Sequence, residues 1–156
     1  MEQTMLSPSP MPVRSSLPQK AERQAHSELM RRFEKALRLG GYTHTFEDVM
    51  EELRCERMQS FAHNNAIVVT QIITEKRAKY LNVFLAVSDD VNDVMAIQPR
   101  FIEFARQHGC HWIQTLGRRG WISVLPKYGW KPTHTLFVLR TDQDVKVTTK
   151  PTADDE

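Results

Sequence analysis

The stretch that decides the fold is Tyr80–Arg140, which reads YLNVFLAVSDDVNDVMAIQPRFIEFARQHGCHWIQTLGRRGWISVLPKYGWKPTHTLFVLR. Its β-branched and aromatic start, Tyr80–Val87, predicts a strand. The amphipathic stretch Asp90–His108 predicts a helix that bends or restarts at Pro99. The remainder predicts a strand at His111–Leu116, a short helix at Arg119–Tyr128 and a final strand at Pro132–Arg140.

The residues upstream complete the pattern. Apolar residues at helical spacing predict a helix over Ala21–Leu39, which Gly40 and Gly41 end. Thr45 is the expected N-cap of a second helix, with Asp48 at the capping-box position. Two more strands are expected, at Met58–Ala62 and Ala66–Ile73. Three antiparallel strands followed by a β-α-β unit predict an α/β (α+β) fold, a mixed and mostly antiparallel sheet flanked by helices in a single domain.

Composition sets the limits of this domain. The first 20 of the 156 residues are rich in proline and serine and predict a disordered or docking N-terminal arm. We expect the domain over 21–140 and a polar tail over 141–156. No apolar run is long enough for a membrane span, and the N-terminus does not read as a secretion signal. The two cysteines, Cys55 and Cys110, are too few for a disulfide scaffold and predict buried free thiols of a reducing compartment.

The order of elements resembles the GNAT (N-acetyltransferase) superfamily, and the segment Met58–Arg140 carries that resemblance. The helix end Gly109-Cys110 and the marks Gly117–Trp121 and Tyr128–Trp130 more narrowly resemble small GNAT-like proteins of tailed phages and prophages. The resemblance implies a protein of the host cytoplasm during phage assembly, or of the virion itself.

The resemblance also implies where an acyl-CoA cofactor would bind. GNAT enzymes hold the pyrophosphate on backbone N–H groups at the start of the long helix, with the pattern Q/R-x-x-G-x-G/A. The matching positions here are Asp89, Asn92 and Val94, and none fits the pattern. Asp89, Asp90 and Asp93 add negative charge there, which suits a helix start that binds no anion. We therefore expect a degenerate cofactor loop and no cofactor.

The family's catalytic residues are also missing from the pattern. The tyrosine that would protonate the leaving thiolate falls on Leu125, and leucine cannot donate a proton. Tyr128 is a weak substitute, since it lies three residues later and is more simply an aromatic before Gly129. Surface carboxylates that could act as a base are Glu51, Glu52 and Glu75, and nothing singles one out.

Three other groups of residues were weighed. His108, Cys110 and His111 do not converge on one face, so no metal site is expected. A basic face on the first helix, which includes Arg32, reads as solvated surface. The third group is basic residues interleaved with an aromatic, a patch for a partner or nucleic acid: Arg118, Arg119, Trp121, Lys127 and Lys131. Packing of Trp121 and Trp130 into the core, which leaves a solvated basic rim, is the favoured alternative to that patch.

Three functions follow from these features. The first is a non-catalytic binding or structural component of a tailed phage virion or its assembly, which docks on other protein subunits through the N-terminal arm. The second is an active N-acetyltransferase that uses acetyl-CoA with an altered loop. The third is a nucleic-acid-binding accessory protein that uses the basic patch.

Overall fold

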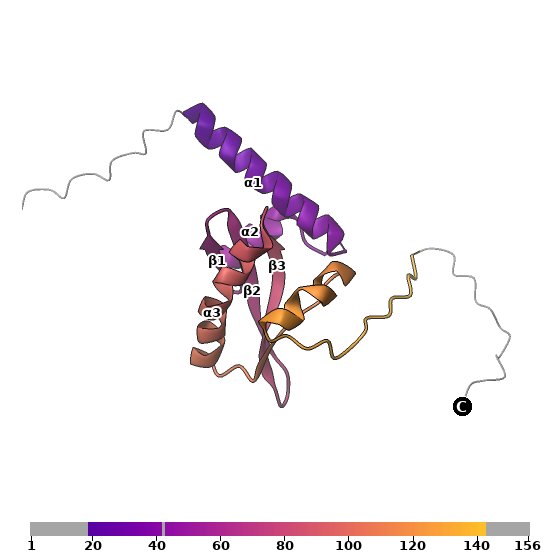
Figure 1. The fold of residues 1–156 in the computed structure, drawn as a ribbon. Helices are drawn as coiled ribbons and strands as arrows, with labels where there is room; N and C mark the ends of the chain where they lie inside the picture. The colour runs from indigo at the N-terminus through magenta and orange to yellow at the C-terminus, as the bar shows by residue number, and fades with distance from the viewer. Residues whose placement is uncertain (1–18, 42, 143–156) are drawn as a thin grey trace, which may run out of the picture. The chain divides into compact units, whose positions relative to one another are not determined.

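The computed structural model describes residues 19–41 and 43–142, so nearly all of the expected N-terminal arm and polar tail lies outside the described residues. The chain divides into two compact units, Met1–Leu116 and Gly117–Glu156. We call them the N-terminal unit and the C-terminal unit and describe each by itself (Figure 1). The domain limits expected from the sequence stay a prediction.

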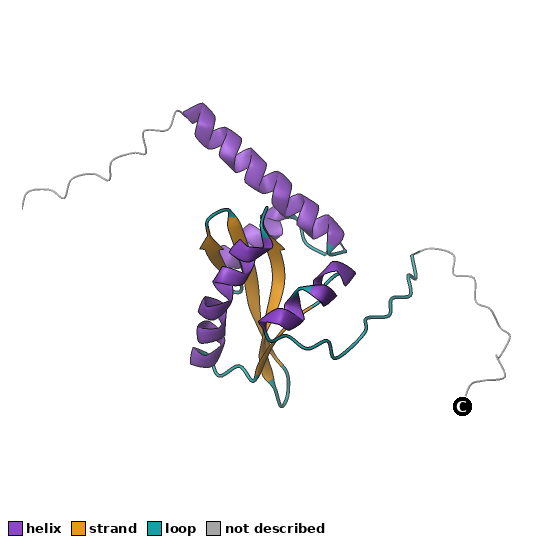
Figure 2. Ribbon diagram, in the orientation of Figure 1, coloured by secondary structure: helices purple, strands orange, loops and turns teal. Residues whose placement is uncertain are grey.

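The N-terminal unit holds three helices and a four-stranded sheet. Its elements in chain order are α1 (Gln19–Leu39), α2 (Phe46–Arg54), β1 (Gln59–His63), β2 (Ala66–Thr74), β3 (Lys79–Val87), α3 (Val91–Gln107) and β4 (Trp112–Thr115). The strands lie in the order β1-β2-β3-β4, with antiparallel neighbours except for the parallel pair β3 and β4. Figure 2 shows these strands with α3 crossing in front of them. The predicted α/β fold with a mixed, mostly antiparallel sheet is confirmed.

Local sequence signals account for the start of α2. The Thr45 side chain accepts a hydrogen bond from the Asp48 N–H at 3.1 Å. In return, the Asp48 carboxylate accepts one from the Thr45 N–H at 2.8 Å. This reciprocal pair is a capping box, because it satisfies two backbone N–H groups that have no partner inside the helix. The predicted N-cap is confirmed.

Two apolar layers hold the sheet between helices. One apolar cluster joins α1 and α2 to the sheet and consists of Phe33, Leu37, Phe46, Val49, Met58, Val69, Leu85 and Val87. Elsewhere in the unit, the Phe61 ring of β1 makes edge contacts with Phe101 and Phe104 of α3, at centroid distances of 6.4 and 5.7 Å. Helices therefore stabilise the sheet mainly through apolar burial.

Two details of the N-terminal unit differ from the sequence predictions. The helix α3 is continuous through Pro99, so it does not restart there, while the alternative of a bend at Pro99 stays a prediction. A proline removes one helical hydrogen bond, but Ile97 and Phe101 on either side are buried and hold both halves of the helix in place. The expected burial of the cysteines is also wrong, because Cys55 is exposed and Cys110 is only partly covered.

The C-terminal unit has less regular structure than expected. The predicted short helix is two 3-10 turns, η1 (Arg119–Ser123) and η2 (Leu125–Tyr128), and Pro126 stands at the start of the second. A proline cannot donate the N–H that a continuous helix would need at that position. The predicted strand Pro132–Arg140 is wrong, because these residues form no ladder with any described residue. Strand propensity is realised only when a neighbouring strand supplies hydrogen bonds.

Candidate functional site

The junction between β3 and α3 is where an acyl-CoA pyrophosphate would bind in the family that the sequence resembles. Asp90 is the N-cap of α3, and its carboxylate accepts a hydrogen bond from the Asn92 N–H at 2.9 Å. The Asp93 N–H donates to the Asp90 carbonyl oxygen at 3.1 Å. Ser88 steadies the cap, since its hydroxyl donates to that same carbonyl and accepts from the Asp90 N–H. The chain's own oxygens thus take two N–H groups of the first turn.

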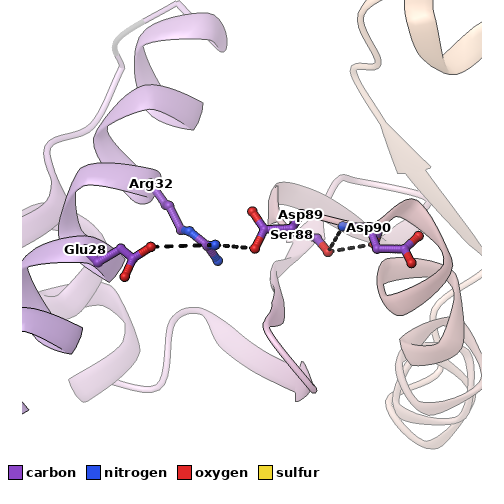
Figure 3. Close-up of polar contacts among 5 residues, drawn as sticks. All are labelled: Glu28, Arg32, Ser88, Asp89 and Asp90. Atoms are coloured by element: carbon purple, nitrogen blue, oxygen red, sulfur yellow. Dashed lines mark hydrogen bonds and ion pairs between the residues drawn. The ribbon is translucent and has the colours of Figure 1, made fainter.

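An ion pair ties this junction to the first helix (Figure 3). The Arg32 guanidinium of α1 pairs with the Asp89 carboxylate and also lies 3.9 Å from the Glu28 carboxylate. The Arg32 side chain is only about a quarter exposed, whereas the Asp89 side chain is largely exposed. Arg32 is therefore more than part of a solvated basic face, which corrects the sequence prediction.

A third aspartate of the junction also has a partner within the unit. The Asn64 side-chain amide, in the turn between β1 and β2, donates to the Asp93 carboxylate at 3.0 Å. Only one cation, Arg32, balances the three carboxylates of Asp89, Asp90 and Asp93 through the contacts just described. A helix N-terminus normally favours anions, but here the acids of the chain supply them.

The three positions of the degenerate cofactor loop have different environments. Asp89 and Asn92 are exposed, whereas Val94 is buried among core residues. A glycine at position 94 would let a ligand approach the backbone closely, whereas the valine found there has a side chain that is buried in the core. These three positions lie at the start of α3, which is capped by its own side chains, and their role in a cofactor loop stays a prediction.

The sheet has an irregularity beside this junction. Between β2 and β3 the register shifts, so that Val69 pairs with Leu85 and Thr70 with Val83, which leaves Phe84 as an extra residue. The ladder between β3 and β4 ends at the pair of Val83 and Thr115. Beyond it, the described residues give β3 no partner on the β4 side. Bulges are common next to binding sites because they redirect backbone groups, and sequence patterns alone do not reveal them.

The carboxylates considered as a base differ in their surroundings. The Glu52 carboxylate accepts a hydrogen bond from Arg57 at 2.8 Å, and this bond lowers the pKa of Glu52 below its ordinary value. Glu51 pairs with Arg54 at 3.0 Å. Glu75 is exposed in the turn between β2 and β3. Because Glu52 is held ionised by its partner, it is poorly suited to accept and release a proton near neutral pH.

The predicted patch lies in the C-terminal unit. Four of its members are exposed and basic, namely Arg118, Arg119, Lys127 and Lys131, and Trp121 is half-buried. A side chain at Gly117 would come within 3.3 Å of the Trp121 Cβ, so the backbone passes close to the indole. Tyr128 is partly exposed and directly precedes Gly129, whose φ of 95° ends η2. This placement fits the interpretation of Tyr128 as an aromatic before a turn.

The side chains of His108 and His111 lie close to backbone groups. His108 lies near the Phe104 carbonyl oxygen, with its Nδ1 at 2.9 Å, and His111 Nδ1 lies 3.1 Å from the Lys79 backbone nitrogen. Within residues 19–41 and 43–142, no cluster of three or more potential metal ligands is found. In that same part of the chain, no helix has the length and apolar character to cross a membrane.

Comparisons with known proteins bear on the fold. No protein-family model matches the chain, and no match was found among curated proteins. A solved structure titled a probable acetyltransferase shares 8% identity over 78% of this chain and 95% of its own, with a TM-score of 0.58. An aminoglycoside N-acetyltransferase in complex with CoA shares 10% identity over 73% and 89%, with a TM-score of 0.54.

A third structure is an acetyltransferase from Trypanosoma brucei, with 12% identity over 71% of this chain and 92% of its own and a TM-score of 0.51. At such low identities these similarities establish the fold. The chain has the fold of the GNAT acetyltransferases, as its sequence predicted.

Proposed function

We propose that this protein is a GNAT-fold binding component that does not use acyl-CoA. The single observation that carries the proposal is the self-capped start of α3, where the Asp90 carboxylate accepts the Asn92 N–H. In a phosphate site, such N–H groups point at the ligand instead. Here an incoming pyrophosphate would have to displace a carboxylate already bonded to the backbone.

Charge acts in the same direction. Asp89, Asp90 and Asp93 bring three carboxylates to one helix turn, and Arg32 is already paired with Asp89. Like charges a few ångströms apart repel, and the repulsion grows when a ligand excludes water from between them. A pyrophosphate at this junction is therefore disfavoured both by lost hydrogen bonds and by repulsion.

The binding role itself follows from the sequence. A proline-rich segment precedes the fold, and proline limits the entropy lost when such a segment docks on a protein partner. The Gly109-Cys110 and Tyr128–Trp130 marks that resemble small phage proteins support a role in a virion or its assembly. The proposed partners are therefore other protein subunits of such an assembly.

Thermal unfolding with added acetyl-CoA tests the proposal. At about 1 mM ligand, a Kd of about 10 μM would stabilise the folded chain by about 2.7 kcal/mol. This corresponds to a rise in Tm of roughly 5–10 °C for a chain of this size. We expect no rise for the natural sequence, and a rise of that order would overturn the proposal.

A restored loop supplies the matched comparison. The variant Asp89→Gln/Asn92→Gly/Val94→Ala has the residues of the Q/R-x-x-G-x-G/A pattern while it keeps Asp90 as N-cap. A fourth change, Asp90→Ser, then removes the carboxylate but keeps a capping side chain. If the loop residues are what excludes the cofactor, acetyl-CoA should raise the Tm of the fourfold variant more than that of the threefold one.

A second function is favoured by the bulge at Phe84 and by the open side of β3 after Val83. These features offer redirected backbone groups beside a sheet edge, and they support an N-acetyltransferase that holds acetyl-CoA in another way. This activity predicts acetyl transfer to an amine, with turnover reduced by Tyr128→Phe. Turnover that survives this substitution would exclude Tyr128 as the proton donor, and no turnover on any amine would favour the binding role.

A further inference from the structure

The C-terminal unit exposes an uninterrupted apolar segment. Leu136, Phe137, Val138 and Leu139 follow one another, and their exposed fractions run from 67% at Leu136 to 89% at Phe137. A soluble protein rarely leaves four consecutive large apolar side chains in water, because each loses the stabilisation that burial gives. Phe137 and Val138 favour strands, and Thr135 and Arg140 bound these four residues. We call Leu136–Leu139 the apolar segment.

The N-terminal unit carries a sheet edge with matching character. The strand β4 is the last in the order β1-β2-β3-β4, so only one of its two sides is paired. Its sequence, Trp-Ile-Gln-Thr, contains no charge and no proline, the residues with which proteins usually protect an edge. Trp112 is 46% exposed, and Leu116, just after the strand, is 74% exposed.

The opposite edge of the sheet is less open. On β1, the Ala62 carbonyl oxygen accepts a hydrogen bond from the Arg100 guanidinium at 2.6 Å. Arg100 also lies over the Phe61 ring, with its guanidinium carbon 5.7 Å from the ring centroid. The helix α3 therefore partly protects the β1 edge, whereas β4 has no comparable protecting charge.

We infer that two copies of this chain associate by strand exchange, in which the apolar segment of each copy adds to the free edge of β4 in the other. Each chain holds one donor segment and one acceptor edge, so a two-fold arrangement uses the donor and the acceptor of both copies. Main-chain hydrogen bonds give such an addition its affinity, and the apolar side chains cover one another.

The available surface is sufficient for a dimer. At roughly 100 Å² per large apolar side chain, the exposed residues of the two segments and two edges offer about 1,200 Å². This area is at the lower end of stable protein interfaces. The dimer is therefore expected to be reversible, with its population set by protein concentration.

Sedimentation velocity over a range of concentrations tests the inference, together with amide hydrogen exchange of the segment. At high concentration, the natural chain should sediment as a species of twice the mass of one chain. The amides of the apolar segment should become protected from hydrogen exchange as the dimer forms. The donor variant Leu136→Asp/Val138→Asp should raise the dimer Kd at least tenfold. These side chains are exposed, so the fold itself should remain intact.

Two further variants locate the contact. Leu116→Asp changes the acceptor end of β4 and should raise the dimer Kd in the same way. Ile122→Asp is the matched control, because Ile122 is also an exposed apolar residue but lies in η1, outside both surfaces. It should leave the Kd unchanged. A mixture of the donor and acceptor variants keeps one of the two strand additions, so it should form more dimer than either variant alone.

Three results would overturn the inference. The first is a monomer at all concentrations with an unprotected segment, which would leave the segment for a different partner. The second is a monomer with a protected segment, which would mean that the strand pairs within its own chain. The third is a dimer that the Leu136→Asp/Val138→Asp and Leu116→Asp variants leave unchanged, which would place the interface elsewhere.

Discussion

The two units of the chain differ in how much of their apolar surface is buried among their own described residues. In the N-terminal unit, sixteen apolar side chains are buried, from Phe33 to Ala105, and the start of α3 is capped by its own carboxylate. In the C-terminal unit, none of the described residues 117–142 is buried. The first unit thus has a closed apolar core and a helix start capped by its own side chain, whereas the second exposes the apolar side chains of Leu136–Leu139.

The largest expected effect contrasts a core residue with an exposed one. Phe33→Ala removes a buried ring that contacts Phe46, with a centroid distance of 5.6 Å. We expect it to lower the free energy of unfolding by about 3–5 kcal/mol, because it loses apolar burial and leaves a cavity. Ile122→Ala, in the C-terminal unit, should change it by less than about 0.5 kcal/mol. Urea unfolding of both variants measures this contrast. Equal losses of unfolding free energy in the two variants would contradict the difference in burial between the units.

The next effect concerns the capping box of α2. Thr45→Ala removes the side chain that accepts the Asp48 N–H, so it should cost about 1 kcal/mol of unfolding free energy. Thr43→Ala is the control, since the exposed Thr43 hydroxyl contacts only the neighbouring His44 ring in the hydrogen bonds found. Denaturant unfolding should separate the two variants, and an equal cost would show that the cap does not stabilise the unit.

A smaller effect compares one ion pair from each unit. The pair Arg32–Asp89 joins α1 to the α3 junction, whereas Arg140–Asp142 joins residues two apart in an exposed segment. Double-mutant cycles with alanine should give a coupling of up to about 1 kcal/mol for the first pair and close to zero for the second. A coupling free energy near zero for Arg32 and Asp89 would show that this ion pair does not stabilise the junction.

The smallest effect is a change of stability with pH. Hydrogen bonds from the Thr45 backbone and side chain hold the pKa of Asp48 below its ordinary value. A lowered carboxyl pKa stabilises the fold above about pH 4 and stops doing so as pH falls through the folded-state pKa. The stability difference between the natural chain and Asp48→Asn should therefore shrink as pH falls from about 5 to about 2.

Chemical unfolding at several pH values measures this difference. Glu47→Gln removes a carboxylate from the same helical turn but keeps Asp48 and its cap. The acid-dependent change attributed to Asp48 should therefore persist in that variant. If the acid-dependent change were lost in Glu47→Gln and kept in Asp48→Asn, the pH dependence would come from Glu47, and the prediction for Asp48 would be wrong.

The sequence predicted those features that depend on near neighbours. Thr45 and Asp48 of the capping box lie three positions apart. The strand Ala66–Thr74 is indicated by its own run of β-branched residues, several of which are buried. The ion pair between Arg32 and Asp89 spans 57 positions, and no local pattern indicates which of several arginines meets which aspartate. The bulge at Phe84 depends on the register between two strands, which the sequence of one strand does not fix.

The wrong prediction of a strand at Pro132–Arg140 has a related cause. Its β-branched and aromatic residues do favour strands, but a strand exists only with a partner, and the described residues supply none. The departure of Asp89, Asn92 and Val94 from the Q/R-x-x-G-x-G/A pattern is a property of the sequence itself, and the degenerate cofactor loop inferred from it stays a prediction. The contacts that Arg32 and Asn64 make with Asp89 and Asp93 span 57 and 29 positions, so no local pattern indicates them.

We propose that the start of α3 binds no acyl-CoA. Isothermal titration calorimetry of the full chain with acetyl-CoA, and with CoA alone, tests it most directly. The account predicts no saturable heat up to about millimolar ligand, that is, binding weaker than about −4 kcal/mol. Saturable binding with a Kd near or below about 10 μM, about −7 kcal/mol or stronger, would contradict it.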